Sequence, residues 1–268
     1  MKNINIGSSN NSDEVKEQYK TSKGLDIRIS FHDKYSTNKQ GYGNWIVSNY
    51  ELFDGMTVLE LGCGTGSLWI GRDEVLGSFG KLVLTDFSEG MLNTARENIG
   101  NRNNIEYRVA DIQNLPFEDN SFDMVIANSM LYHVPDINKG INEVRRVLKD
   151  EGTFYCATLG ENNFVEKLAE WFRLSGENFN PNHNFTMQNG EQILGAAFSN
   201  VEARFYADSL HVTDIDDLVN YLRSLASLKA LNDIPLERLK EIIMEHSVNG
   251  VVDLPKEYGI FIAKGYEL

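Results

Sequence analysis

Residues 57–71 read TVLELGCGTGSLWIG, an apolar run that passes into three alternate glycines and then into a second apolar run. Glycine suits a sharp turn from strand to helix in which the backbone lies against a ligand, because it carries no Cβ. The stretch therefore predicts a strand, a turn at Gly62, Gly64 and Gly66, and a helix over about 67–76. Such turns also occur without a ligand, so the spacing alone leaves the function open.

Two acidic residues follow the glycines at the ends of the next predicted strands. Asp86 closes the strand 81–87, about 20 residues after the last glycine, where a carboxylate can accept hydrogen bonds from a ribose diol. Asp111 closes the strand 105–111. Open α/β sheets bind ligands at the carboxyl edge of their strands, so both acids are expected beside the glycine turn. A dinucleotide fingerprint would need glycine where Ser67 stands, which disfavours a nicotinamide oxidoreductase.

The central region continues to alternate strand-like and helical patterns. Further strands are expected at 122–129 and 152–159, and helices at 88–99 and 137–148. The strand segments are nearly continuous Val, Leu and Ile, as in parallel strands covered by helices on both faces. An α/β, doubly wound fold follows.

The pattern changes after Leu159. The segments expected there are, in order, helices at 162–176 and 189–198, a strand at 201–213, helices at 214–231 and 235–248, and a last strand at 258–265. The two helices before the last strand are expected to form a lid, at about 214–250, inserted into the closing hairpin of the sheet.

The chain is expected to divide into three parts. Residues 1–13 are polar and read as a disordered lead-in, and residues 14–50 read as a helical N-terminal arm. Residues 51–268 form the main domain, which is large enough for one sizeable core.

Composition narrows the classes of partner. The net charge is −14, which disfavours nucleic acid and anionic membranes as partners, and no window approaches the roughly 18 apolar residues of a membrane span. Cys63 and Cys156 lie in apolar runs and read as buried free thiols of a reducing compartment, which favours the cytoplasm. No His and Cys spacing matches a metal site, so no metal is expected.

Four stretches together carry a family resemblance. They are VLELGCGTG (58–66), LTDFSEGML (84–92), VADIQNLPFEDNSFDMVIANSMLYHV (109–134) and INEVRRVLKDEGTF (141–154). In order and spacing this region resembles class I S-adenosylmethionine-dependent methyltransferases, most closely those that methylate small molecules and quinone precursors. The resemblance covers 57 to about 159. It implies a Rossmann-like, mostly parallel seven-stranded sheet with an antiparallel last strand, and it implies that the arm caps the substrate.

The resemblance also implies which residues hold the methionine end of the cofactor. Glu60 would face the ammonium group, and the backbone of Gly62, Cys63, Gly64 and Gly66 would face the carboxylate. Glu60 has an alternative role as the partner of a neighbouring basic residue.

The nucleoside end would meet five further residues. The resemblance implies that Asp86 binds the ribose hydroxyls, Phe87 lies against adenine, and Asp111 accepts a hydrogen bond from the adenine amino group. The Ile112 backbone would contact a ring nitrogen, and Asn128 would lie near the sulfonium. Phe87 has an alternative role as a core aromatic residue.

His133 and its neighbour Tyr132, just past the fourth strand, are the candidates for catalysis. An acceptor that must lose a proton would use a base near the methyl group, and His133 is the best-placed titratable residue. The alternative is a structural histidine that ties the loop to a helix capped by Asp136.

Several other residues bear on the acceptor. His32 and His183 stand in polar surroundings and are expected at the surface. Aromatic side chains would wall an apolar acceptor pocket or pack on the sheet, namely Tyr19, Phe31, Tyr35, Tyr42, Trp45, Trp171 and Phe172.

The sequence thus predicts a methyltransferase that takes S-adenosylmethionine, releases S-adenosylhomocysteine and methylates a small organic molecule. A methyltransferase for RNA or protein is one alternative. Another is a cofactor-binding protein without transferase activity, because every motif concerns the cofactor.

Overall fold

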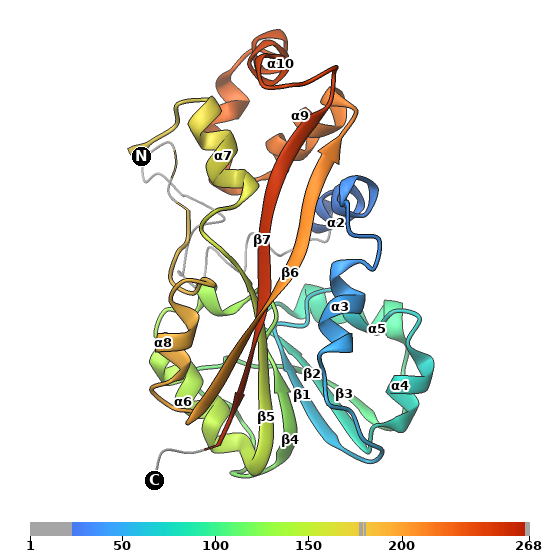
Figure 1. The fold of residues 1–268 in the computed structure, drawn as a ribbon. Helices are drawn as coiled ribbons and strands as arrows, with labels where there is room; N and C mark the ends of the chain where they lie inside the picture. Colours follow the sequence, from blue (N-terminus) through green and yellow to red (C-terminus); the bar gives the residue numbers. More distant parts are fainter. Residues whose placement is uncertain (1–22, 177–178, 180, 266–268) are drawn as a thin grey trace.

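The computed structural model describes residues 23–176, residue 179 and residues 181–265 (Figure 1). The predicted lead-in at 1–13 and the first part of the arm, 14–22, lie outside these residues.

Seven strands form one sheet with the order β3-β2-β1-β4-β5-β7-β6. The strands are β1 (Thr57–Leu61), β2 (Lys81–Asp86), β3 (Ile105–Val109), β4 (Phe122–Ile126), β5 (Leu148–Leu159), β6 (Asn200–Val212) and β7 (Val252–Lys264). Neighbours are parallel from β3 to β5, and β7 runs antiparallel to both β5 and β6. This confirms the predicted doubly wound, mostly parallel sheet with an antiparallel last strand.

Helices cover both faces of the sheet. One face packs against α3 (Tyr42–Ser48), α4 (Asp73–Ser78) and α5 (Glu89–Ile99), and the other against α6 (Ile137–Val147) and α8 (Gly190–Leu194). Successive strand residues point to opposite faces, so in β1 Val58 joins the first of these cores and Leu59 the second.

The β6–β7 hairpin is much longer than the rest of the sheet and projects beyond it (Figure 1). Its far half is surrounded by a separate hydrophobic cluster. The elements of that cluster are α2 (Lys23–Tyr35), α7 (Phe164–Trp171), α9 (Ile215–Ser224), the 3₁₀ helix η4 (Ala226–Asp233) and α10 (Leu236–Glu245).

Some predicted boundaries are wrong. The helix expected at 67–76 is a 3₁₀ turn, η1 (Ser67–Trp69), followed by α4, because Gly71 adopts φ +73° between them. The helix expected at 214–231 is interrupted at Leu225, which is extended. The last strand begins at Val252, six residues before the predicted start.

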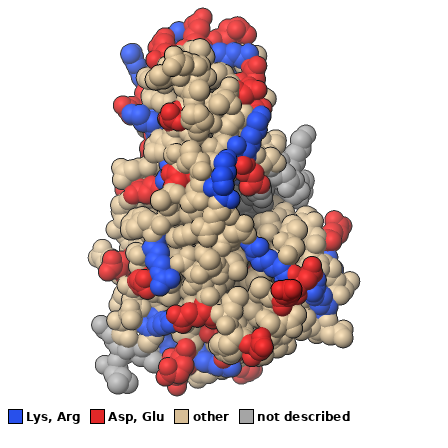
Figure 2. Space-filling model, turned by 45° about the vertical axis from the view of Figure 1, so that its right-hand side comes forward, with Lys and Arg blue, Asp and Glu red and all other residues tan. Residues whose placement is uncertain are grey.

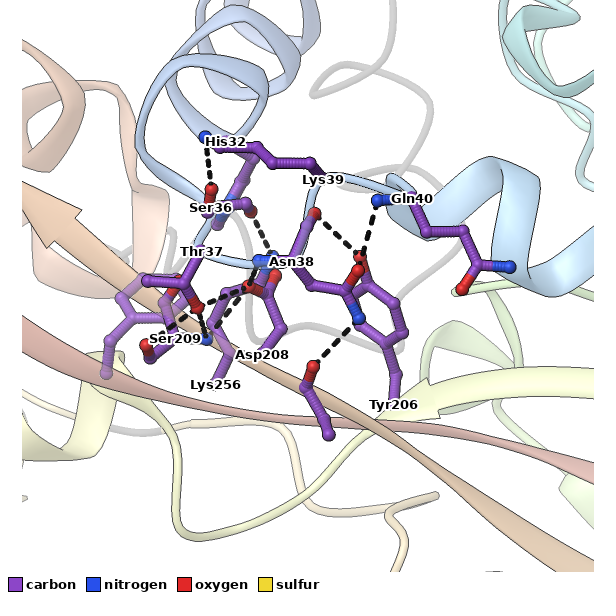
Figure 3. Close-up of polar contacts among 12 residues, drawn as sticks. His32, Ser36, Thr37, Asn38, Lys39, Gln40, Tyr206, Asp208, Ser209 and Lys256 are labelled. Atoms are coloured by element: carbon purple, nitrogen blue, oxygen red, sulfur yellow. Dashed lines mark hydrogen bonds and ion pairs between the residues drawn. The ribbon is translucent and has the colours of Figure 1, made fainter.

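A short segment, Ser36–Gly41, connects α2 to α3 and is called the strap here. It pairs with β6: Ser36 bridges Leu210, and the Thr37 N–H donates to the Ser209 carbonyl at 2.9 Å (Figure 3). The strap therefore ties the arm to the hairpin.

Candidate active site

A cavity of about 770 Å³ opens at the carboxyl edge of the parallel strands. Its lower end is formed by the loop after β1 and the ends of β2, β3 and β4, and its upper end by α2, α3, α7, α9 and β7. The volume is ordinary for a site that holds a cofactor-sized ligand.

The glycine loop is shaped by backbone conformation and close packing. Gly62 has φ +66°, and a Cβ there would lie 2.9 Å from the Met130 side chain. Gly66 has φ +71°, and its Cβ would lie 2.5 Å from Ile99 Cδ1 on α5. Gly62 lines the cavity but Gly66 does not. The missing Cβ of Gly66 instead allows α5 to pack closely against the loop.

Three backbone N–H groups of this loop have partners within the protein. The N–H of Cys63 donates to the Thr85 carbonyl at 2.8 Å, that of Gly64 to Asp86 Oδ2 at 2.9 Å, and that of Gly66 to the Cys63 carbonyl at 3.0 Å. These three N–H groups are therefore already paired within the protein.

Glu60 lies at the end of β1, lines the cavity and is 3% exposed. Trp69 Nε1 donates to Glu60 Oε2 at 2.5 Å. The alternative in which a basic residue pairs with Glu60 is wrong, since the partner is a neutral indole. Burial raises the pKa of Glu60 to about 7, and the Trp69 hydrogen bond opposes this rise.

Asp86 lies across the loop from Glu60. It accepts from the backbone N–H of Gly64 and, at Oδ1, of Ser88 at 2.8 Å. Burial nevertheless raises the pKa of Asp86, because the desolvation outweighs these hydrogen bonds. The neighbouring Phe87 also lines the cavity.

Asp111 and Ile112 continue this wall beyond β3. Asp111 accepts from the Gln113 backbone N–H at 2.9 Å, and Ile112 is 6% exposed. The carboxylates of Glu60, Asp86 and Asp111 thus line one end of the cavity. This set of acceptors suits hydroxyl, amino and ammonium groups and opposes phosphate.

Asn128 follows β4 and also lines the cavity. Its Nδ2 donates to the Tyr50 hydroxyl at 2.8 Å, and its Oδ1 accepts from the Ala157 N–H at 3.1 Å. Both ends of the amide thus hold β4, β5 and the segment after α3 together.

Tyr132 and His133 lie on a 3₁₀ turn, η2 (Leu131–His133), and both line the cavity. Their rings are 4.6 Å apart between centroids. Asp136 caps α6 by accepting from the Lys139 N–H at 3.0 Å, as predicted. The turn and the cap thus hold the segment that carries His133 at the wall of the cavity.

Most of the aromatic residues expected to wall the acceptor pocket do not reach it. Tyr42 lines the cavity, whereas Tyr19 lies outside the described residues. The others belong to the hydrophobic cluster around the hairpin or pack against it, namely Phe31, Tyr35, Trp45, Trp171 and Phe172.

The upper end is walled instead by aromatic residues of other elements. Besides Tyr42 and Tyr132, these are Phe164 on α7, Tyr221 on α9 and Tyr258 on β7. Sequence reasoning missed the last three because each falls in a pattern that reads as ordinary core packing.

The prediction that His32 is a surface residue is wrong. Its ring contacts those of Phe164, Tyr221 and Tyr258, and its Nε2 lies 2.9 Å from the Tyr221 hydroxyl. Burial lowers the pKa of His32 to about 3, and nearby Lys256 adds to this effect. His32 is therefore neutral at physiological pH.

His183 lines the cavity too, with its side chain 40% exposed. Its Nε2 lies 3.4 Å from Glu166 Oε1. Asn182 Nδ2 donates to the Tyr132 carbonyl at 2.6 Å, so this loop borders the turn that carries His133.

Within the described part of the chain, no group of three or more His, Cys, Asp and Glu side chains is placed to hold a metal ion. In the same residues, no helix has both the length and the apolar character to cross a membrane.

Comparison with known proteins shows the family to which the chain belongs. The model of a family described as a methyltransferase domain matches residues 52–204, more than half of the chain. The chain belongs to this methyltransferase domain family. The match includes the glycine loop and the acid-lined end of the cavity.

Two curated proteins named as methyltransferases are similar to the chain in sequence. A demethylmenaquinone methyltransferase of Desulfitobacterium hafniense is 39% identical over 116 residues, which cover 42% of this chain and 46% of that protein. The ubiquinone/menaquinone biosynthesis C-methyltransferase UbiE of Escherichia coli is 43% identical over 101 residues, 37% of this chain and 40% of that protein. The matches thus span a little under half of these relatives.

A solved structure extends the comparison to the fold of most of the chain. The YcgJ protein of Bacillus subtilis superposes with a TM-score of 0.58 at 17% identity, over 84% of this chain and 98% of that one. At this identity the likeness concerns the fold alone.

Proposed function

We propose that the protein transfers a methyl group from S-adenosylmethionine to a small organic molecule and releases S-adenosylhomocysteine. The observation that carries the proposal is a single cavity that joins an acid-lined glycine loop to a chamber walled by aromatic rings. A methyl donor and an acceptor need such a shared space, because alignment and exclusion of water supply much of the rate of an in-line displacement.

The lower end of the cavity fits the donor. Glu60 is assigned to the ammonium group, and the loop from Gly62 to Gly66 forms the turn beneath the amino acid part. Asp86 is assigned to the ribose hydroxyls and Asp111 to the adenine amino group. When bound, the cofactor would supply a methyl group already activated by the sulfonium.

Four further residues complete the donor site in this proposal. Phe87 would lie against adenine, and the Ile112 backbone would contact its ring. Cys63 would contribute backbone only, since burial raises the pKa of its thiol well above the usual value. Asn128 would act by holding the strand ends together, because its amide is already paired.

The upper end fits the acceptor. Tyr42, Phe164, Tyr221 and Tyr258 would enclose an apolar molecule, and the arm from 14 to 50 would serve as its cap over the methyltransferase domain at 51–268. The two relatives named for menaquinone or ubiquinone biosynthesis support a small acceptor of quinone type.

His133 is the proposed base for an acceptor that loses a proton, with Tyr132 beside it. Both line the cavity that is shared by the proposed donor and acceptor ends. His32 is unsuited to this role because its low pKa makes it a very weak base.

The surface supports a small acceptor over a nucleic acid. On the face drawn in Figure 2, the described Lys and Arg side chains are interspersed with Asp and Glu and form no continuous basic track. With a net charge of −14, electrostatic attraction to a polyanion is weak. A cytoplasmic location is proposed on the two buried free thiols, Cys63 and Cys156.

The test has two stages. Equilibrium dialysis should first detect binding of S-adenosylhomocysteine to the folded protein. Incubation with methyl-labelled S-adenosylmethionine and a fractionated metabolite extract should then label one small compound. The same incubation with the Asp86→Ala variant is the control and measures the label that appears without donor binding. Binding without transfer to any compound would favour the cofactor-binding protein, and label in RNA or protein would favour the macromolecular methyltransferase.

A further inference from the structure

Trp69 holds Glu60 without reaching the cavity itself. Its indole N–H donates to Glu60 Oε2 at 2.5 Å, and its side chain is 1% exposed. The ring packs edge-on against Phe79, with centroids 5.6 Å apart, and the Trp69 backbone N–H donates to the Gly66 carbonyl at 3.0 Å. Of the pair, Glu60 alone lines the cavity. An effect of the Trp69 indole N–H on a ligand therefore passes through Glu60.

Among the residues that the structure describes, Glu60 has no positively charged partner within ion-pair distance. The titratable groups that face it are Asp86 on β2, Cys63 in the loop and Tyr50 in the segment after α3. Within the described residues, no Lys, Arg or His forms an ion pair with Glu60. An ionised carboxylate is costly in such a buried place when no cation lies beside it, so the surroundings favour the neutral acid.

We propose that Trp69 is a positioning residue that directs Glu60 toward the ammonium group of S-adenosylmethionine, and that binding of the cofactor expels the carboxyl proton of Glu60 into solvent. The inference rests on the proposed cofactor. The O–H bond of the carboxyl group breaks, the proton passes to buffer, and the ligand ammonium keeps its own protons. The ligand thus supplies the positive charge that the protein lacks at this position.

The raised pKa of Glu60, about 7, sets the pH range of the effect. Below pH 7 the free protein must lose a proton to bind, so affinity rises with pH, and above pH 7 it levels off. The affinity for S-adenosylhomocysteine should therefore be about tenfold higher at pH 8 than at pH 6. Calorimetry at pH 6 in buffers of different ionisation enthalpy should show release of close to one proton per ligand.

A matched ligand separates Glu60 from the nucleoside-binding residues. 5′-Methylthioadenosine has the same nucleoside but lacks the amino acid part, so its affinity should change less than twofold over the same pH range. Any pH dependence that both ligands share belongs to the nucleoside end of the site, where burial raises the pKa of Asp86.

Three variants test the contact. Glu60→Gln should remove the pH dependence that is specific to S-adenosylhomocysteine. Trp69→Phe removes the N–H donor, which raises the pKa of Glu60 further. The rise in affinity for S-adenosylhomocysteine should therefore move to higher pH. The affinity that the variant loses relative to wild type should become smaller toward pH 9. Phe79→Leu disturbs the packing of the Trp69 ring but keeps its N–H, and it should leave the profile unchanged.

Each outcome is decisive. Equal pH dependence for the two ligands overturns the proton release, even though both still bind. A loss of affinity in Trp69→Phe that is the same at every pH would assign Trp69 a structural role and overturn the positioning. Failure of both ligands to bind the wild-type protein would refute the proposed cofactor itself.

Discussion

Lys256 and Asp208 stand directly opposite each other in the β6–β7 hairpin and form an ion pair in which both side chains are at most 2% exposed. Lys256 Nζ also donates to Ser36 Oγ at 2.8 Å, and Asp208 Oδ1 accepts from the Asn38 N–H at 2.9 Å (Figure 3). Lys256 lines the upper end of the cavity, and its Nζ lies 4.8 Å from the centroid of the Tyr258 ring. One buried pair thus joins the hairpin, the strap and the cavity wall.

Removing one member of this pair should destabilise the protein strongly. Lys256→Met leaves Asp208 buried without its counter-charge, which typically costs about 3–5 kcal/mol in the free energy of unfolding. The double variant Lys256→Met, Asp208→Leu should recover much of this loss. Urea unfolding measures the free energy of unfolding of the single and the double variant. The exposed pair of Lys240 and Asp216 provides the control, and Lys240→Met should cause no comparable change. A single variant as stable as wild type would contradict the role of the pair.

Glu60→Gln should stabilise the unliganded protein at neutral and higher pH. A glutamic acid with an unfolded pKa of 4.5 and a folded pKa of about 7 binds more protons in the folded state between these values. Stability is therefore lost as pH rises through that interval, by up to about 3 kcal/mol. The amide cannot ionise and escapes this loss. Thermal or urea unfolding at pH 5 and pH 8 should show that the free energy of unfolding of the variant, relative to wild type, increases as the pH rises. An equal difference at both pH values would rule out this titration.

Asp86→Ala should weaken binding of S-adenosylhomocysteine by about 1.5–3 kcal/mol, the scale of a hydrogen bond to a charged group. The loss should appear with 5′-methylthioadenosine too, because Asp86 is assigned to the ribose. Isothermal calorimetry at pH 8 gives both affinities. Glu89→Ala, an exposed acid on the first turn of α5, should bind both ligands as wild type does. Unchanged affinity in Asp86→Ala would remove Asp86 from the donor site.

His133→Ala should separate turnover from donor binding. A general base contributes about 10²–10⁴ in rate, so kcat for the labelled acceptor should fall by at least about 100-fold. The affinity for S-adenosylhomocysteine should stay within twofold, because His133 is assigned to the acceptor and not to the donor. Loss of affinity and turnover by the same factor would point to a structural histidine in η2.

The sheet and the acid-lined end of the cavity could be predicted because local sequence patterns encode them. The apolar run before Gly62 and the acids at Asp86 and Asp111 report strand ends, and parallel strand ends share an edge. The loop contacts were not predictable in the same way. Whether the Gly64 N–H faces a ligand or Asp86 depends on side-chain packing between β1 and β2.

The upper end of the cavity could not be read from the sequence because its contacts are long-range. His32 and Tyr221 are 189 residues apart in the chain. The segment around Pro255 resembles a loop, since proline is excluded from central strands. It is a strand because β5 ends opposite Tyr258, so beyond that residue β7 has β6 as its only strand neighbour in the sheet.

The reach of the β6–β7 hairpin beyond β5 lets one stretch of sequence, 164–258, supply much of the upper end of the cavity, to which α2 and α3 add His32 and Tyr42. The acid-lined end is built before residue 131, whereas Phe164, Tyr221, Lys256 and Tyr258 all come from the hairpin, its inserted helices or α7. Related chains that diverge in that second stretch would keep the same acid-lined end. Grafting 164–258 between two relatives would then exchange the shape of one compartment and leave the other as it was.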